Sequence, residues 1–147
     1  MNISKDYIEQ TTRVYKALLE GKPRTDEAFH IIKQDATYYC PAFPTLRTVN
    51  EAIDNYCKLK GSNHPIVQIT SASDPVITWN ENYVCFVGSI TATHTGRGGP
   101  VEPSDPPKVS TDDYCEMFKL DDQGRIVEIR DLWDYYRAFR ALGWPLP

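Results

Sequence analysis

Two acidic residues have types and spacing that could perform proton-transfer chemistry. Glu116 lies eight residues before a turn glycine and Asp131 lies seven residues after it. Stretches rich in β-branched and aromatic residues flank the turn cluster DDQG at 121–124, which predicts an antiparallel hairpin. If Leu120 sits opposite Arg125, the two acids are diagonal neighbours on adjacent strands, with Cα atoms about 7 to 8 Å apart. Both carboxyl groups would then reach one ligand.

Alternation along the predicted hairpin separates its two faces, because successive strand side chains point to opposite sides. The expected inner face holds both acids among apolar neighbours: Tyr114, Glu116, Phe118, Leu120, Val127, Ile129, Asp131 and Trp133. The expected outer face is charged but also partly apolar: Lys119, Glu128, Arg130, Cys115, Met117, Ile126 and Leu132. The sequence therefore places the acid pair on the side that faces the core.

Two carboxyl groups in apolar surroundings do not both ionise easily, because burial and like charge each disfavour the second negative charge. One acid should keep its proton toward neutral pH while its neighbour stays ionised, which gives a general acid beside a general base. The alternative is that the acids lie at a rim and pair with Arg130, Arg137 or Lys119. A slip of one residue in register would reverse every side chain. Spacing alone leaves both interpretations open.

Composition narrows the class of protein. A chain of 147 residues fits one domain, 1–147, with a real core. Sixteen basic against twenty acidic residues give a net charge of -4, and no basic run is present, so nucleic acid is not an expected partner. The first ten residues are polar and no apolar stretch approaches the length of a membrane span. We expect a soluble, cytoplasmic protein without membrane contact.

Metal and redox motifs are not found in the sequence. The four cysteines, at 40, 57, 85 and 115, form no CxxC pair, and the histidines at 30, 64 and 94 show no ligand spacing. We expect reduced thiols, no metal and no cofactor.

The order of predicted elements is α+β. A helix over Tyr7–Leu19 follows a Ser4 cap and ends at Gly21 and Pro23. The remaining elements are a helix from Thr25 to Lys33, a strand at 35–40, a helix opened by the capping box Thr48–Glu51 and running to Leu59, strands at 66–73, 76–79 and 83–95, the hairpin, and a last helix closed by Gly143 and Pro145. The connection 96–110 either covers a pocket mouth or is an ordinary solvated loop.

Several short motifs are similar to those of SnoaL-like proteins in the nuclear-transport-factor-2-like superfamily. They are DATYYCP at 35–41, HTG at 94–96, DQGRIVEIRDLWD at 122–134 and LGWP at 142–145. The superfamily includes polyketide cyclases, ketosteroid isomerases and limonene-epoxide hydrolases. The resemblance implies a cone-shaped, curved antiparallel or mixed sheet wrapped around N-terminal helices and enclosing an apolar pocket. It also implies a homodimer.

The resemblance also implies roles for individual residues. Glu116 lies where ketosteroid isomerases have a protonated aspartate that donates to the substrate oxyanion, and Trp133 lies where they have a pocket tryptophan. Asp131 lies near the place where epoxide hydrolases and polyketide cyclases have a catalytic aspartate. Cys40 departs from the pattern, because it occupies the place of the steroid isomerase base and a thiol is a poor substitute for that carboxylate. Steroid isomerisation by the familiar route is therefore disfavoured.

The favoured function is a cofactor-independent cyclase or isomerase that acts on a polyketide, a meroterpenoid or a similar natural-product intermediate. Asp131 would move a proton next to a carbonyl, while protonated Glu116 and Tyr114 would donate to the enolate oxygen. Candidate walls of the substrate pocket are Tyr15, Tyr38, Cys40, Phe118 and Trp133, with His94 at the mouth. Each aromatic residue has an alternative role in the core, and His94 has one as a structural hydrogen-bonding residue.

Two further functions stay open. In an epoxide hydrolase of the limonene-epoxide type, Asp131 would activate water and Glu116 would protonate the epoxide oxygen, but the strand VCFVGSITATH lacks the Arg-x-Asp pair of those enzymes. A non-catalytic module that binds small molecules as a dimer is the other alternative. For each of the three functions, the expected homodimer would use the apolar residues of the expected outer face, Cys115, Met117, Ile126 and Leu132.

Overall fold

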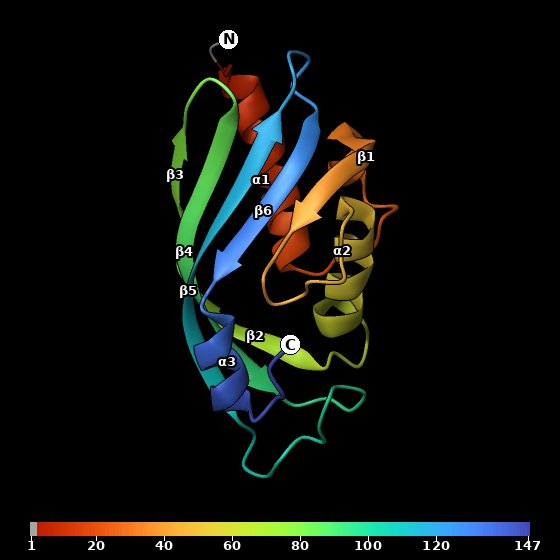
Figure 1. Cartoon of the computed structure of the whole chain (residues 1–147), viewed down its shortest axis with the longest axis vertical. Helices are drawn as coiled ribbons and strands as arrows, with labels where there is room; N and C mark the ends of the chain where they lie inside the picture. The colour runs from red at the N-terminus through yellow and green to blue at the C-terminus, as the bar shows by residue number, and fades with distance from the viewer. Residues whose placement is uncertain (1–2) are drawn as a thin grey trace.

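The computed structural model describes residues 3–147 as a six-stranded curved sheet with helices packed against it (Figure 1). The helical elements are α1 (Lys5–Leu19), the 3-10 helix η1 (Glu27–Ile31), α2 (Val49–Tyr56), the π-helical turn η2 (Cys57–Gly61) and α3 (Tyr135–Leu142). The strands are β1 (Ile32–Tyr39), β2 (Val67–Ala72), β3 (Val76–Trp79), β4 (Tyr83–His94), β5 (Val109–Leu120) and β6 (Ile126–Trp133). The α+β class expected from the sequence is confirmed.

The sheet is mixed, with strand order β1-β6-β5-β4-β2 and β3 paired to the other end of β4. Only the β1–β6 pair is parallel among the strand pairs of residues 3–147. The long strands β4 and β5 form its centre, and α1 and α2 lie along one side of the sheet in Figure 1. Among residues 3–147, no helix combines the length and apolar character needed to cross a membrane.

Local sequence signals explain where the helices begin. The Ser4 hydroxyl accepts a hydrogen bond from the Tyr7 amide at 3.2 Å, which caps α1. The Thr48 hydroxyl accepts from the Glu51 amide at 3.2 Å and donates to the Glu51 carboxylate at 2.9 Å, at the start of α2. The expected cap at Thr25 is wrong, because Asp26 accepts from an amide two residues later and starts only the short helix η1. The following strand accordingly begins earlier than expected, at Ile32.

The third predicted helix, expected to run from Thr48 to Leu59, also ends differently. Regular α2 stops at Tyr56, and the chain continues to Gly61 as a π-helical turn. Gly61 packs backbone to backbone against Gly21 at the end of α1, since a Cβ on Gly61 would lie 1.8 Å from the Gly21 carbonyl oxygen. The close approach needs glycine and fixes η2 against α1. It thereby fixes the position of Lys60, which directly precedes Gly61.

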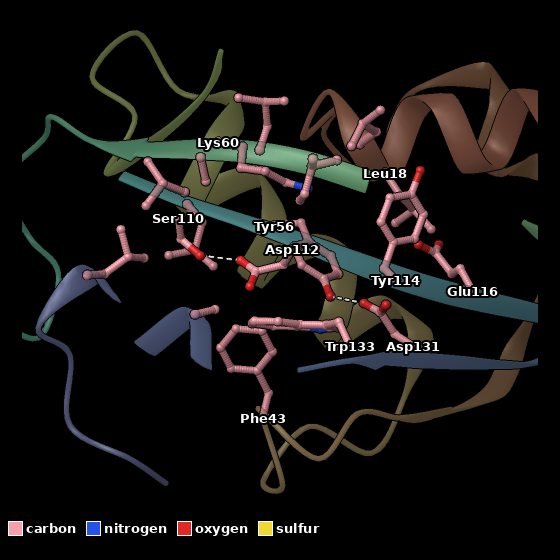
Figure 2. Close-up of a pocket in the computed structure, with 18 of the residues that line it drawn as sticks. Leu18, Phe43, Tyr56, Lys60, Ser110, Asp112, Tyr114, Glu116, Asp131 and Trp133 are labelled. Atoms are coloured by element: carbon pink, nitrogen blue, oxygen red, sulfur yellow. Dashed lines mark hydrogen bonds between the residues drawn. The ribbon is translucent and has the colours of Figure 1, made fainter. Parts of the chain in front are cut away.

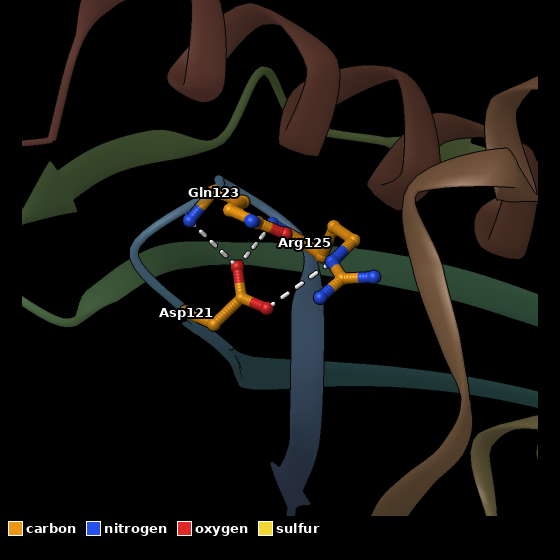
Figure 3. Close-up of polar contacts among 3 residues, drawn as sticks. All are labelled: Asp121, Gln123 and Arg125. Atoms are coloured by element: carbon orange, nitrogen blue, oxygen red, sulfur yellow. Dashed lines mark hydrogen bonds and ion pairs between the residues drawn. The ribbon is translucent and has the colours of Figure 1, made fainter.

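The β5–β6 turn sets the hairpin register (Figure 3). The Asp121 carboxylate accepts hydrogen bonds from the Gln123 amide at 2.9 Å and the Arg125 amide at 3.0 Å, and the Arg125 guanidinium donates to it at 3.2 Å. Although the slight burial of Asp121 opposes the effect, these donors lower the pKa of its carboxyl. Gly124 completes the turn at φ +75°, a conformation that other residues rarely adopt.

This turn corrects the register expected from the sequence. Leu120 pairs with Ile126 rather than Arg125, and Phe118 pairs with Ile129. The change of offset between these two pairs makes Val127 a bulge, so Ile126 points inward and is fully buried instead of lying on the outer face. From the Phe118–Ile129 pair onward, each β5 residue pairs with a β6 residue two positions later than expected. A shift by an even number of residues keeps each side chain on its expected face. The acids stay inside.

The core lies between the inner face of the sheet and the helices. Residues that are 0 or 1 % exposed come from both layers: Val14, Val49, Ile53, Val84, Phe86, Phe118, Ile126 and Ile129. The opposite face of the sheet retains exposed apolar side chains, among them Val76 and Val87 on neighbouring strands. Apolar burial therefore holds the helices to one face, on which the acid pair also lies.

Candidate functional site

A cavity of about 120 Å³ opens between the inner face of the sheet and the helices (Figure 2). That volume is far above the roughly 10 to 15 Å³ that one water needs. Its wall is mostly hydrocarbon and aromatic, with side chains from α1, α3, the α2–η2 segment and the central strands. Besides tyrosines, four titratable side chains of residues 3–147 reach it: Lys60, Asp112, Glu116 and Asp131. Such a mixture of apolar wall and few polar groups is typical of small-molecule sites.

Asp131 is anchored by two tyrosines. It is 6 % exposed, on β6, and its Oδ2 accepts hydrogen bonds from the Tyr38 hydroxyl at 3.0 Å and from the Tyr56 hydroxyl. The two phenol oxygens also lie 2.7 Å apart. Within residues 3–147 no protein group donates to the second oxygen, Oδ1. The tyrosines therefore fix one oxygen of the carboxylate and leave the other without a protein donor among these residues.

Opposing effects act on the pKa of the Asp131 carboxyl group. Burial raises the pKa of its carboxyl, whereas the hydrogen bonds from Tyr56 and Tyr38 and the nearby Lys60 lower it. Hydrogen bonds to the charged form thus offset part of the cost of burial. The pKa remains above its ordinary value of 3.8.

Glu116 faces Asp131 directly across the β5–β6 pair rather than diagonally. It is half-buried and lines the cavity, and no group within residues 3–147 forms a hydrogen bond with its carboxyl. Burial and the charge of Asp131 raise the pKa of Glu116 well above 4.5, with only Lys60 opposing them. Because donors stabilise charge on Asp131 and none does so on Glu116, Glu116 is the second of the two acids to lose its proton.

Tyr56 and Lys60 are among the residues of this site that sequence reasoning missed. The Lys60 ammonium lies 4.5 Å from the centre of the Tyr56 ring, and both side chains line the cavity. Burial lowers the pKa of Lys60, while Glu116 and Asp131 raise it. A signal was present in the sequence, because Tyr56 extends the apolar face of Val49 and Ile53 and Lys60 lies one turn later.

Two of the predicted wall residues, Tyr15 and Trp133, line the cavity, and so does Tyr114, which was predicted as a proton donor. The hydroxyls of Tyr15 and Tyr114 form a hydrogen bond, and the Tyr15 ring stacks on Phe86 with centroids 4.4 Å apart. Trp133 pairs with Tyr114 across the strands and packs against Phe43 at 6.2 Å between ring centroids. Burial raises the pKa values of both tyrosines, so both hydroxyls stay protonated at neutral pH.

Three other predicted wall residues lie behind the cavity. Phe118 is fully buried and packs edge-on against Phe86, with centroids 5.3 Å apart. Tyr38 supports Asp131 from the side of β1, as its hydrogen bond shows. Cys40 is 2 % exposed, and burial together with the charge of Asp131 raises the pKa of its thiol to about 11. A thiol that keeps its proton at neutral pH is no general base.

His94 lies in the structure as a buried hydrogen-bonding residue rather than at a mouth. It is 1 % exposed, and its Nδ1 accepts from the Trp144 indole at 3.3 Å. Its Nε2 lies 3.1 Å from the Gly96 carbonyl oxygen, so that nitrogen carries the proton and donates. Both ring nitrogens are thereby satisfied within the protein. None of the residues 95–109 lines the cavity, so the long loop does not form its wall.

Comparisons with known proteins were made at three levels. Neither the protein-family models nor the curated proteins include a match to the sequence. Solved structures do match. One, named as a SnoaL-like polyketide cyclase from Jannaschia sp. CCS1, has a TM-score of 0.72 at 15 % identity and covers 99 % of each chain.

Two further structures support the same fold. An NTF2-like protein from Burkholderia xenovorans LB400 has a TM-score of 0.68 at 13 % identity and covers 97 % of this chain and 99 % of its own. A SnoaL-like polyketide cyclase, so named, from Shewanella putrefaciens CN-32 has a TM-score of 0.68 at 15 % identity, with coverage of 96 % and 98 %. At such identities the likeness concerns the fold. The chain therefore has the fold of these SnoaL-like and NTF2-like structures.

Proposed function

We propose that this protein is a cofactor-independent isomerase or cyclase that transfers a proton next to a carbonyl group of an apolar substrate. The observation that carries the proposal is the direct pairing of Glu116 and Asp131 on the wall of an apolar cavity. The two carboxyl groups differ in their hydrogen bonding, which separates their affinities for a proton. Such a pair gives a base and an acid in one site.

In the proposed reaction Asp131 is the base. Its Oδ2 is held by Tyr38 and Tyr56, so its Oδ1 removes the proton from the carbon beside the carbonyl. The proton on Glu116 then stabilises the negative charge that develops on the carbonyl oxygen. In an unsaturated ketone, return of the proton from Asp131 to the far carbon of the conjugated enolate gives isomerisation. Attack of the enolate carbon on a second carbonyl of the same molecule gives a ring, and the alkoxide formed from that carbonyl takes up the proton from Asp131. Either course needs only these side chains.

The substrate class follows from the wall of the cavity. Rings from Tyr15, Tyr114, Phe43 and Trp133 offer flat apolar surfaces, which suit a fused or aromatic carbon skeleton. Polyketides and meroterpenoids have such skeletons with carbonyl groups next to acidic carbons. Structural neighbours named as polyketide cyclases support the same class.

Epoxide opening is the less favoured reaction. The inward positions of β4 that pair with Glu116 and Tyr114 are Phe86 and Gly88, so this strand brings no charged pair to the acids.

The proposed protein acts as a homodimer, as the resemblance implies. Its contact surface would be the outer face around Val87, Cys115 and Leu132, which are neighbours across three strands.

Hydrogen exchange in heavy water tests the proposed proton transfer before the natural substrate is identified. We suggest 2-tetralone and 1-tetralone, which are fused-ring ketones, with loss of the signal of the protons next to the carbonyl followed by proton NMR. The wild-type protein should accelerate exchange, and Asp131→Asn should lower the rate at least about 100-fold. Asp113→Asn is the matched control, because Asp113 lies on β5 but on the exposed face.

Two other outcomes of the exchange experiment would contradict the proposal. Equal exchange rates for wild type and Asp131→Asn would overturn the role of Asp131. Calorimetry shows whether each ketone binds. Binding of both ketones to the wild-type protein without accelerated exchange of either would replace the enzyme with a non-catalytic binding module.

A further inference from the structure

A second polar pair lies in the same cavity, away from the proposed catalytic acids. Asp112 is 9 % exposed, and its Oδ2 accepts a hydrogen bond from the Ser110 hydroxyl. The other carboxyl oxygen, Oδ1, is buried and receives no hydrogen bond from any group of residues 3–147. Both side chains line the cavity. A buried carboxyl oxygen without a donor is costly and is uncommon in folded proteins.

The strand geometry places this pair at the opposite end of the site. Asp112 and Glu116 lie four residues apart on β5, on the same face, so their Cα atoms are at most about 14 Å apart. Tyr114 lies between them on that face. Figure 2 shows Ser110 and Asp112 toward one end of the cavity and Glu116 and Asp131 toward the other, with Trp133 alongside. The cavity thus has an acidic group at each end.

We propose that Ser110 and Asp112 form a specificity subsite, which binds a hydroxyl group at the far end of an elongated substrate. This inference rests on the proposed function, because it takes the cavity to be the substrate site. The ligand hydroxyl donates to Asp112 Oδ1, directly or after a half-turn of the carboxyl group that exchanges its two oxygens. The lone pairs of the Ser110 oxygen are available to the same hydroxyl.

The count of acceptors favours a hydroxyl over an ammonium group. An ammonium group has three donors that point in different directions, whereas the acceptors at this end are two neighbouring oxygen atoms, Asp112 Oδ1 and Ser110 Oγ. A buried ammonium would keep an unsatisfied donor, and it would share the cavity with Lys60. A carboxylate or phosphate group is disfavoured, because it would bring further acceptor oxygens beside those of Asp112, and the Ser110 hydroxyl already donates to Asp112. The subsite therefore selects a hydroxylated skeleton, such as a phenol.

The test compares two probes that differ at one position, where a hydroxyl is replaced by a methoxy group. In 6-hydroxy-2-tetralone a ketone and a hydroxyl lie at opposite ends of a fused ring system, and 6-methoxy-2-tetralone lacks the O–H. Calorimetry should show that the wild-type protein binds the hydroxyl probe about tenfold or more tightly than the methoxy probe. Asp112→Leu should abolish this preference, and Asp112→Asn should reduce it. Asp113→Leu, on the exposed face, should keep it.

The results separate this inference from the proposed function. Equal binding of the two probes to the wild type, or a preference that survives in both Asp112 variants, overturns the subsite. A loss of affinity for both probes alike in the Asp112 variants assigns Asp112 a structural role and also overturns it. If Asp112→Leu does not fold in a thermal denaturation experiment, the isosteric Asp112→Asn gives the result. A clear hydroxyl preference without any ketone exchange by the wild type contradicts only the proposed function.

Discussion

Glu116 and Asp131 are direct partners across the β5–β6 pair, and only Asp131 is held by tyrosine hydroxyls. The asymmetry comes from outside the β5–β6 hairpin, since Tyr56 belongs to α2 and Tyr38 to the edge strand β1. The hairpin therefore places two similar acids side by side, and α2 and β1 make them different. Several measurable consequences follow from this arrangement.

The pH dependence of ketone exchange should be bell-shaped. Asp131 acts when ionised, so the rate rises with pH through its pKa, and Glu116 acts when protonated, so the rate falls at higher pH. Tyr56→Phe removes a hydrogen bond that lowers the pKa of Asp131, which moves the rising limb to higher pH. Tyr135→Phe, outside the cavity lining, is the matched control. A rising limb that stays in place in Tyr56→Phe would disprove the coupling between Tyr56 and Asp131.

Replacing Lys60 should move both limbs of the same profile. The positive charge of Lys60 lowers the pKa values of Glu116 and Asp131, so Lys60→Met should shift both limbs toward higher pH. Lys58→Met is the control, because Lys58 belongs to the same π-helical turn but is exposed. Rate profiles of the three proteins over a common pH range give the comparison. If Lys60→Met and Lys58→Met behave alike, Lys60 has no electrostatic part in the site.

Glu116 should reduce the stability of the protein at high pH. Burial raises the pKa of Glu116 in the folded state above its ordinary value of 4.5. At pH values between the unfolded-state pKa and the folded-state pKa, the folded protein therefore binds more protons than the unfolded protein. Stability contributed by Glu116 is therefore complete below about pH 4.5 and is lost as pH rises through the folded pKa. At pH 8 Glu116→Gln should be more stable than wild type, by more than the ~0.5 kcal/mol of a typical surface change.

Chemical denaturation at several pH values measures this gain, which should shrink toward pH 4. Glu128→Gln is the control, because Glu128 pairs with Lys119 on the outer face of the hairpin. A gain that does not change with pH would contradict the electrostatic origin.

A side chain at position 124 should destabilise the protein. The φ of +75° at Gly124 strains other residues, and a Cβ there would lie 2.5 Å from the Tyr7 ring of α1. Gly124→Ala should cost about 1 to 3 kcal/mol of unfolding free energy, measured by thermal denaturation. Gly98→Ala also has a positive φ but meets no atom closer than 3.8 Å, so it reports backbone strain alone. A smaller loss for Gly124→Ala than for Gly98→Ala would show that the contact with Tyr7 yields easily.

Alternation predicted the inner face of the hairpin, because a period of two survives a shift of two residues. The direct pairing of Glu116 and Asp131 was not predicted. It depends on the hydrogen bonds that Asp121 accepts within the turn and on the bulge at Val127, which no periodicity reveals. Near the turn the bulge moved Ile126 from the expected outer face into the core.

The helical half of the site was harder to predict. Tyr56 lies 75 positions before the carboxylate that it contacts, and only the packing of α2 against the sheet brings them together. Asp112 is on the inner face of the same strand as Glu116, so alternation extended four residues would have found it. His94 shows the opposite case, because a residue able to do chemistry is satisfied by the Trp144 indole and a backbone carbonyl.

The backbone contact between Gly21 and Gly61 has a consequence for how this site can change during evolution. This contact holds the end of α1 against the end of η2, and the two helical segments carry Tyr15, Tyr56 and Lys60. Replacement of the residues from Val49 at the start of α2 to Lys60, directly before Gly61, would alter the basicity of Asp131 without any change in the strands. New reactivity is thus accessible on this scaffold through a single short exchange that leaves the acid pair in place.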